Sequence, residues 1–124
     1  MDTQMMVRTA IVLLGITALG GLRMAGIRFT GSPRPPSSIA MLHGLLAASG
    51  LTLLIYAGTT SGLPAPALLG LLILMAAALG GLVLNLVYHT KDLPLPIWLV
   101  LAHAAIAVVG FVVLVIGGWN VTAA

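Results

Sequence analysis

The chain of 124 residues contains no cysteine, no glutamate and very few charges of either sign. Charged residues make up 6% of the sequence, whereas a soluble globular domain carries about 25%. The absence of cysteine excludes disulfides, thiolate metal sites, iron–sulfur clusters and covalent haem attachment through a C-x-x-C-H motif. Any metal or cofactor must therefore be held by histidine, methionine, asparagine or the backbone.

Hydrophobic residues take the place of the missing charges. They make up 60% of the chain, and its mean hydropathy is +1.21. The few basic residues lie near the ends of apolar segments, so the high isoelectric point reflects membrane topology, and nucleic acid is not an expected partner. This composition predicts an all-α integral membrane protein.

Four apolar segments reach the length of about 20 residues that a membrane-spanning helix needs. They cover residues 5–27, 38–56, 64–88 and 96–121, and the short connections between them contain proline and glycine. Residues 1–26 resemble a signal peptide in that Arg8 is followed by an apolar run, but no small-residue cleavage site comes after it, so we expect this segment to be retained.

The sequence repeats itself at an offset of sixty residues. Pro36, His43, Ala47, Gly50, Leu54 and Gly58 recur as Pro96, His103, Ala107, Gly110, Leu114 and Gly118. The run 18–22 likewise recurs as 78–82. This pattern predicts one transmembrane domain, residues 1–124, that is a tandem duplication of a two-helix unit (repeat 1, residues 1–60; repeat 2, residues 61–120) and folds as an up-down four-helix bundle.

The basic residues are distributed unequally between the two ends of the expected bundle. Arg23, Arg28, Arg34 and Lys91 fall with the first and third connections, and only Arg8 falls with the chain termini. The positive-inside rule then predicts that both termini lie outside the cytoplasm and the first and third connections inside it. We expect the membrane to be a bacterial inner membrane.

Two histidines share one level of the expected bundle. His43 and His103 each lie seven residues after a proline, about two turns into parallel helices. The second and fourth helices of such a bundle lie on a diagonal of roughly 14 Å. That gap suits a planar macrocycle with one imidazole on each side of its iron, and we expect it to be too wide for two imidazoles to share a bare zinc ion with bonds of about 2 Å.

Glycine pairs on the first and third helices complete a pattern that resembles a known family. Histidines on the second and fourth helices, with Gly20–Gly21 and Gly80–Gly81 on the others, resemble the haem-binding four-helix core of the cytochrome b family and, more loosely, the bacterial b561-type membrane cytochromes. The resemblance implies that His43 and His103 are axial ligands of one haem b and that the four glycines contact the porphyrin. It implies a bis-histidine electron carrier, although no second histidine pair is present for a second haem.

Two further residues are candidates for the surroundings of such a cofactor. Arg23 directly follows the first glycine pair and is the expected partner of a haem carboxylate. His89, whose counterpart in the first repeat is Phe29, is a candidate for a propionate contact, a quinone contact or a proton relay. Because it stands next to Thr90 and Lys91, we interpret His89 as a solvated residue at a helix end.

Other functions stay open on the sequence alone. An intramembrane histidine often makes only a structural polar contact, and a haem-free accessory subunit of a membrane complex has the same composition. A small transporter or channel is less favoured because the chain has no membrane-embedded carboxylate. With no nucleophile beside a base, the chain is at most the electron-transfer subunit of an oxidoreductase. Expected partners are membrane lipid and a redox partner protein or quinone, within a larger complex or homo-oligomer.

Overall fold

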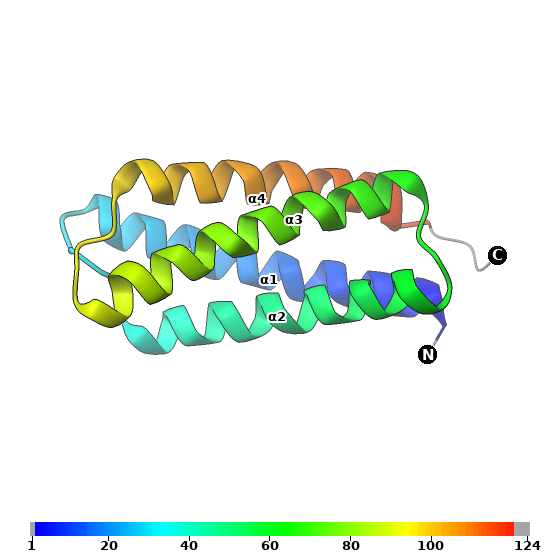
Figure 1. The fold of residues 1–124 in the computed structure, drawn as a ribbon, viewed down its shortest axis with the longest axis horizontal. Helices are drawn as coiled ribbons and strands as arrows, with labels where there is room; N and C mark the ends of the chain where they lie inside the picture. Colours follow the sequence, from blue (N-terminus) through cyan, green and yellow to red (C-terminus); the bar gives the residue numbers. More distant parts are fainter. Residues whose placement is uncertain (1, 121–124) are drawn as a thin grey trace.

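The computed structural model describes residues 2–120 and consists of four long helices that lie along a common direction (Figure 1). The helices are α1 (Thr3–Phe29), α2 (Ser37–Thr60), α3 (Ala65–Val83) and α4 (Ile97–Gly118). A π-helical turn, η1 (Leu84–Tyr88), and a 3₁₀ turn, η2 (His89–Lys91), extend α3, so its apolar span runs over Ala65–Lys91. No β-strand occurs in the described part.

All four helices are long and apolar enough to cross a membrane, which confirms the predicted all-helical transmembrane bundle. The observed bounds lie within a few residues of the expected segments, except that the expected end of the fourth, residue 121, lies outside the described residues. Asp2 caps α1 by accepting a hydrogen bond from the backbone N–H of Met5 at 2.7 Å. Pro36, Pro64 and Pro96 stand directly before α2, α3 and α4, where no intrahelical donor is needed.

The start of α1, the end of α4 and the 61–64 connection lie at one end of the bundle, which we call the terminal end (Figure 1). The 30–36 and 92–96 connections lie at the opposite end, which we call the loop end. The main helix contacts join α1 to α2, α2 to α3, α3 to α4 and α4 to α1. This order places α2 and α4 across the bundle from one another.

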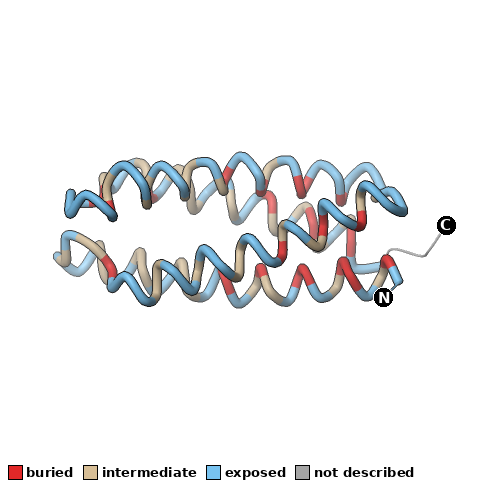
Figure 2. The backbone as a smooth tube through the Cα atoms, turned by 60° about the horizontal axis from the view of Figure 1, so that its bottom comes forward, coloured by how far each residue is buried: buried red, intermediate tan, exposed pale blue. Residues whose placement is uncertain are grey.

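The buried core occupies the terminal half of the bundle, as Figure 2 shows. Leu54, Leu114 and Val7 are its largest fully buried side chains. The buried positions of α1 end at Thr17, and those of α3 end at Ala77. Beyond these residues the same faces continue toward the loop end, but their side chains are only half-buried. The helices therefore pack tightly on each other over one half of their length.

Polar contacts join the two connections at the loop end. The Nε of Arg28 donates to the carbonyl of Leu95 at 2.8 Å, and the N–H of Leu95 donates to the carbonyl of Pro33 at 3.1 Å. Arg34 forms an ion pair with Asp92. These contacts hold the ends of the two helix pairs together where the apolar core is absent.

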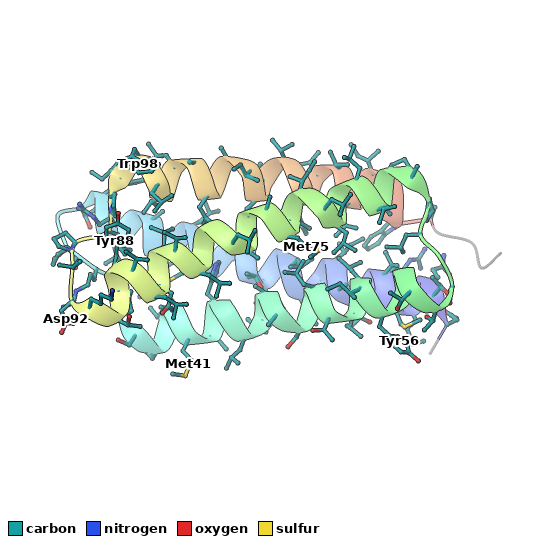
Figure 3. The ribbon with its side chains drawn as sticks, viewed as in Figure 1. Met41, Tyr56, Met75, Tyr88, Asp92 and Trp98 are labelled. Carbon is teal, nitrogen blue, oxygen red and sulfur yellow. The ribbon has the colours of Figure 1, made fainter. Side chains whose placement is uncertain are left out.

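Aromatic side chains lie near both ends of the bundle. Figure 3 shows Tyr88 and Trp98 toward the loop end and Tyr56 toward the terminal end. Trp119 also lies at the terminal end, where the Arg8 guanidinium stands 5.3 Å from the centre of its ring and donates to its carbonyl at 3.0 Å. Tyrosine and tryptophan are enriched at membrane–water interfaces, so these positions agree with helices that span a bilayer.

Candidate functional site: a histidine pair between the helices

His43 on α2 and His103 on α4 approach each other across the interior of the bundle. Their ring centroids are 6.3 Å apart, and the ring planes are inclined at 69°. Both residues are half-buried. Because α2 and α4 lie across the bundle from one another, the two imidazoles lie between the helices at one level.

Each imidazole is held by a backbone carbonyl of the neighbouring helix. Nδ1 of His43 lies 2.9 Å from the carbonyl oxygen of Thr17, and Nδ1 of His103 lies 2.8 Å from that of Ala77. A carbonyl can only accept, so Nδ1 must carry the ring hydrogen, and Nε2 of the neutral ring keeps its lone pair. No hydrogen bond involves either Nε2 among the described residues. Both rings are therefore oriented with one nitrogen left for a ligand.

The glycine pairs lie directly against these two rings. A Cβ atom added to Gly21 would stand 3.1 Å from Cε1 of His43, and one added to Gly81 would stand 3.1 Å from Cε1 of His103. Added Cβ atoms at Gly20 and Gly80 would lie 3.9 and 3.7 Å from Nδ1 of the same rings. The glycines thus give the imidazoles room against α1 and α3, a role that the sequence did not show.

The separation of the rings corrects one expectation. Two imidazoles on opposite sides of one metal ion place their centroids about 6 Å apart, given a bond of about 2 Å on each side and about 1.1 Å from each nitrogen to its ring centre, whereas the tetrahedral angle of zinc brings the centroids to about 5 Å. The observed 6.3 Å is far shorter than the diagonal of roughly 14 Å between the helix axes, so that diagonal overestimates the gap between the rings. The two distances differ because histidine side chains reach inward from the helix axes. Within residues 2–120, no group of three or more His, Asp or Glu side chains is placed to hold a metal ion.

The bundle interior changes its packing at the level of the histidines. On the terminal side, the inward positions of α1 and α3 are buried as far as Thr17 and Ala77. On the loop side, no residue of the α1 segment 18–29 or of the α2 segment 37–49 is buried. Val100 of α4 and His89 are buried there, but the positions of α1 and α3 that continue their inward faces are only half-buried: Gly20, Gly21, Met24, Gly80, Gly81, Leu84 and Asn85. This half of the bundle therefore does not close on itself as the terminal half does.

The structure does not bring Arg23 to the histidines. Its side chain is exposed on the outer face of α1, and no described residue forms a hydrogen bond with it. Arg28 and Arg34, in contrast, are partly buried and make the polar contacts of the loop end. Four basic residues were expected at the loop end, and among them Arg28 and Arg34 contact the 92–96 connection.

His89 is buried, so its interpretation as a solvated helix-end residue is wrong. Only 9% of its surface is exposed, whereas Phe29, at the matching position of the first repeat, is 49% exposed. The backbone also differs between the two positions, because α1 stays regular to Phe29 whereas the π-helical turn Leu84–Tyr88 directly precedes His89. Nε2 of His89 lies 3.2 Å from Oγ of Ser37, and its Nδ1 has no partner in the described part of the chain.

The class of protein that these observations define is a transmembrane four-helix bundle with a pair of oriented histidines in its interior. Comparisons with family models, curated proteins and solved structures found no match to this chain. The function is therefore inferred from the chemistry of the histidine pair. Each ring keeps one nitrogen without a hydrogen bond among the described residues, and a neutral imidazole nitrogen is a common metal ligand in proteins.

Proposed function

We propose that this chain is a small b-type membrane cytochrome, in which His43 and His103 are the axial ligands of one non-covalent haem b. The observation that carries the proposal is the ring pair itself. Two imidazoles from opposite helices lie 6.3 Å apart, each with Nδ1 bonded to a carbonyl and Nε2 free. In such a site the haem supplies one-electron transfer and, with both axial positions taken, has no open position for oxygen or substrate.

The carbonyls of Thr17 and Ala77 support this role. A ligating histidine usually donates its other ring hydrogen to a carbonyl or carboxylate, which fixes the tautomer and the ring orientation. Both histidines do so here, to residues sixty positions apart. Because the acceptors are backbone atoms of packed helices, the rings are oriented before any metal arrives.

The half-packed interior favours a macrocycle over a bare ion. A two-coordinate ion between the rings would need no further space, and the helices on the loop side would be free to pack against each other. Instead, the inward residues of α1 and α3 there stay half-buried, with the glycine pairs at their start, although Val100 of α4 is buried. A flat apolar ring beside the histidines would cover these positions, and Gly20, Gly21, Gly80 and Gly81 would be its closest backbone neighbours.

The remaining parts of the proposal concern ancestry, orientation and partners. The matching histidine contacts in the two halves support descent from a duplicated two-helix unit, folded up-down-up-down. The basic residues of the loop end favour that end as the cytoplasmic one, with both termini outside, in a bacterial inner membrane. The chain then passes single electrons to a partner protein or a quinone as a subunit of a redox complex.

A haem-free accessory subunit is the second candidate, and a specific observation favours it. The Nδ1 contacts of His43 and His103 join α2 to α1 and α4 to α3, which is a sufficient reason for an intramembrane histidine. In that case Nε2 of His43 and Nε2 of His103 do not bind a metal or a cofactor. The two candidates differ in one measurable property, which is the presence of haem.

The test is the reduced-minus-oxidised absorption spectrum of the full chain, expressed with haem supplied and purified in detergent. We expect a low-spin b-type spectrum with one haem per chain. His43→Ala and His103→Ala should each remove it, while His89→Phe, which changes the third histidine to the residue of the first repeat, should keep it. Adding imidazole to the two alanine variants should restore the spectrum in part.

Two results would contradict the proposal. A colourless protein with native helical content favours the haem-free accessory role. A haem spectrum that survives both alanine substitutions assigns the ligands elsewhere. Circular dichroism of each variant separates loss of the ligand from loss of the fold.

A further inference from the structure

A second polar site lies at the loop end, away from the histidine pair. A cavity of about 460 Å³ is lined by residues 32–37 together with Ile27 and His89. It is bordered by the C-terminal part of α1, the N-terminus of α2 and the end of the α3 span. The candidate membrane spans end at Phe29 and Lys91 and begin at Ser37, so the cavity lies at the ends of the spans, where a bilayer has its headgroups.

His89 is the buried polar group of this cavity. The residue is 9% exposed, and its Nδ1 has no hydrogen-bond partner in the described part of the chain. The π-helical turn Leu84–Tyr88 directly precedes it. A buried ring nitrogen without a partner costs free energy, and π-helical turns occur frequently at functional sites, so both features single out this end of the α3 span.

Arg34 adds a positive charge to the same wall. One of its terminal nitrogens is used by Asp92 and by the carbonyl of His89. Its Nε and its second terminal nitrogen form no hydrogen bond with described residues, so the guanidinium keeps donors for a further acceptor. Asp92 is the one acidic residue at this end, and its side chain is 80% exposed.

The N-terminus of α2 supplies a second set of donors. Pro36 stands before the helix and provides no side-chain cap, and no described group accepts from the backbone N–H of Ser37 or Ser38. Free N–H groups and the helix dipole favour an anion at such a position. The donors of α2 and of Arg34 come from two segments, and His89 contacts the start of α2 through Ser37, an arrangement that suits a tetrahedral group with oxygens in several directions.

We propose that this cavity binds the acidic phosphate group of an anionic phospholipid, with Arg34 and the N-terminus of α2 as its donors and with His89 as the positioning residue that contacts the start of α2 through Ser37. The binding does not depend on haem. Its effect is to fasten the loop end, where the apolar core is missing, to the headgroup layer. The same donors would accept inorganic phosphate from water, so the experiment must separate the two sources.

Lipid retention measured by native mass spectrometry tests this proposal. The full chain in detergent is titrated with phosphatidylglycerol and, separately, with phosphatidylcholine that has the same acyl chains. We expect one phosphatidylglycerol per chain, bound about tenfold more tightly than phosphatidylcholine, and a loss of about tenfold in Arg34→Gln and in His89→Phe. Lys91→Gln, an exposed residue at the same end with the same change in charge, should keep the binding.

Asp92→Asn distinguishes a phosphate site from a purely structural ion pair. It removes the partner of Arg34 and leaves the guanidinium, so binding of phosphatidylglycerol should persist or strengthen. Three results would overturn the proposal: equal losses in Arg34→Gln and Lys91→Gln, a loss in Asp92→Asn as large as in Arg34→Gln, or displacement of the lipid by millimolar inorganic phosphate. If Arg34→Gln does not fold, His89→Phe alone decides, since it changes no charge.

Discussion

His43 and His103 lie in equivalent surroundings, each bonded through Nδ1 to a carbonyl 26 residues earlier in the chain and each packed against a glycine pair. The distances are also equal, since a Cβ atom added to Gly21 or to Gly81 would stand 3.1 Å from Cε1 of the neighbouring histidine ring. The orientation of both rings therefore depends on residues that carry no side chain of their own.

Gly21→Ala and Gly81→Ala should weaken haem retention under the proposed function. The added methyl group would stand 3.1 Å from the imidazole, so the ring must move by a few tenths of an ångström and its Nδ1 contact must distort. Overpacking of this kind costs about 1–3 kcal/mol, and we expect each variant to hold haem at least about fivefold more weakly. The haem content per chain after dilution measures this.

Gly26→Ala is the matched control for these two variants. No atom lies within 4 Å of a Cβ added at Gly26, which is also on α1. Haem retention should stay unchanged, and the helix should gain about 0.5–1 kcal/mol from the loss of glycine flexibility. Equal haem loss in all three variants would show that the glycines near the histidines have no special role.

Gly70→Ala should destabilise the fold itself. A Cβ at Gly70 would stand 2.6 Å from the backbone nitrogen of Leu114, and backbone cannot move aside as a side-chain tip can. Separating α3 from α4 at this contact should cost at least about 1–3 kcal/mol. Thermal unfolding in detergent measures the change, with Gly44→Ala as the control because nothing lies within 4 Å of its added Cβ. Similar unfolding temperatures for the two variants would contradict the close α3–α4 contact.

Leu114→Ala should also destabilise the terminal half. Leu114 is fully buried, whereas Ile116, two residues on, is 78% exposed. Lipid is as apolar as leucine, so the loss comes from packing and from the cavity left behind rather than from contact with water. We expect about 1–3 kcal/mol for Leu114→Ala and less than about 0.5 kcal/mol for Ile116→Ala, measured by the same unfolding assay. Equal effects would show that the core does not lie where the burial places it.

Single cysteines test the orientation in the membrane. Because the chain has no cysteine of its own, each introduced thiol is the only one present. Ser61→Cys, in the terminal-end connection, should react with a membrane-impermeant maleimide in intact cells, and Thr30→Cys, at the loop end, should react only after lysis. Both positions are exposed, so access to the reagent does not favour either. The opposite labelling pattern would place the loop end outside.

Much of the fold could be predicted from the sequence, since apolar length and prolines located the four helices within a few residues. The features that could not be predicted depend on contacts between distant segments. The sequence could not predict that the carbonyls of Thr17 and Ala77 accept from the histidines, because every residue has the same backbone carbonyl. The π-helical turn before His89 was not visible either, since neither its residues nor the offset from Phe29 specify a changed helical pitch.

One missed contact did have a signal in the sequence. Asp92 is the only acidic residue at the loop end, and Arg34 is one of a few basic residues there, so a pair between the two connections was a reasonable expectation. The preference for Arg23 as the interior cation rested on its proximity in sequence to Gly21. Its position on the outer face of α1 shows that proximity along a helix does not fix the face.

The sequence by itself determined that the chain is helical and spans a membrane four times, because the number of apolar residues in a segment sets whether it can cross a bilayer. It also determined that two histidines share one depth, since a helix rises by a constant amount per residue. Only the tertiary structure decided how closely the rings approach, which carbonyls orient them, and that the core is confined to one half of the bundle. These depend on helix rotation and tilt, which are set by the packing of all four helices together.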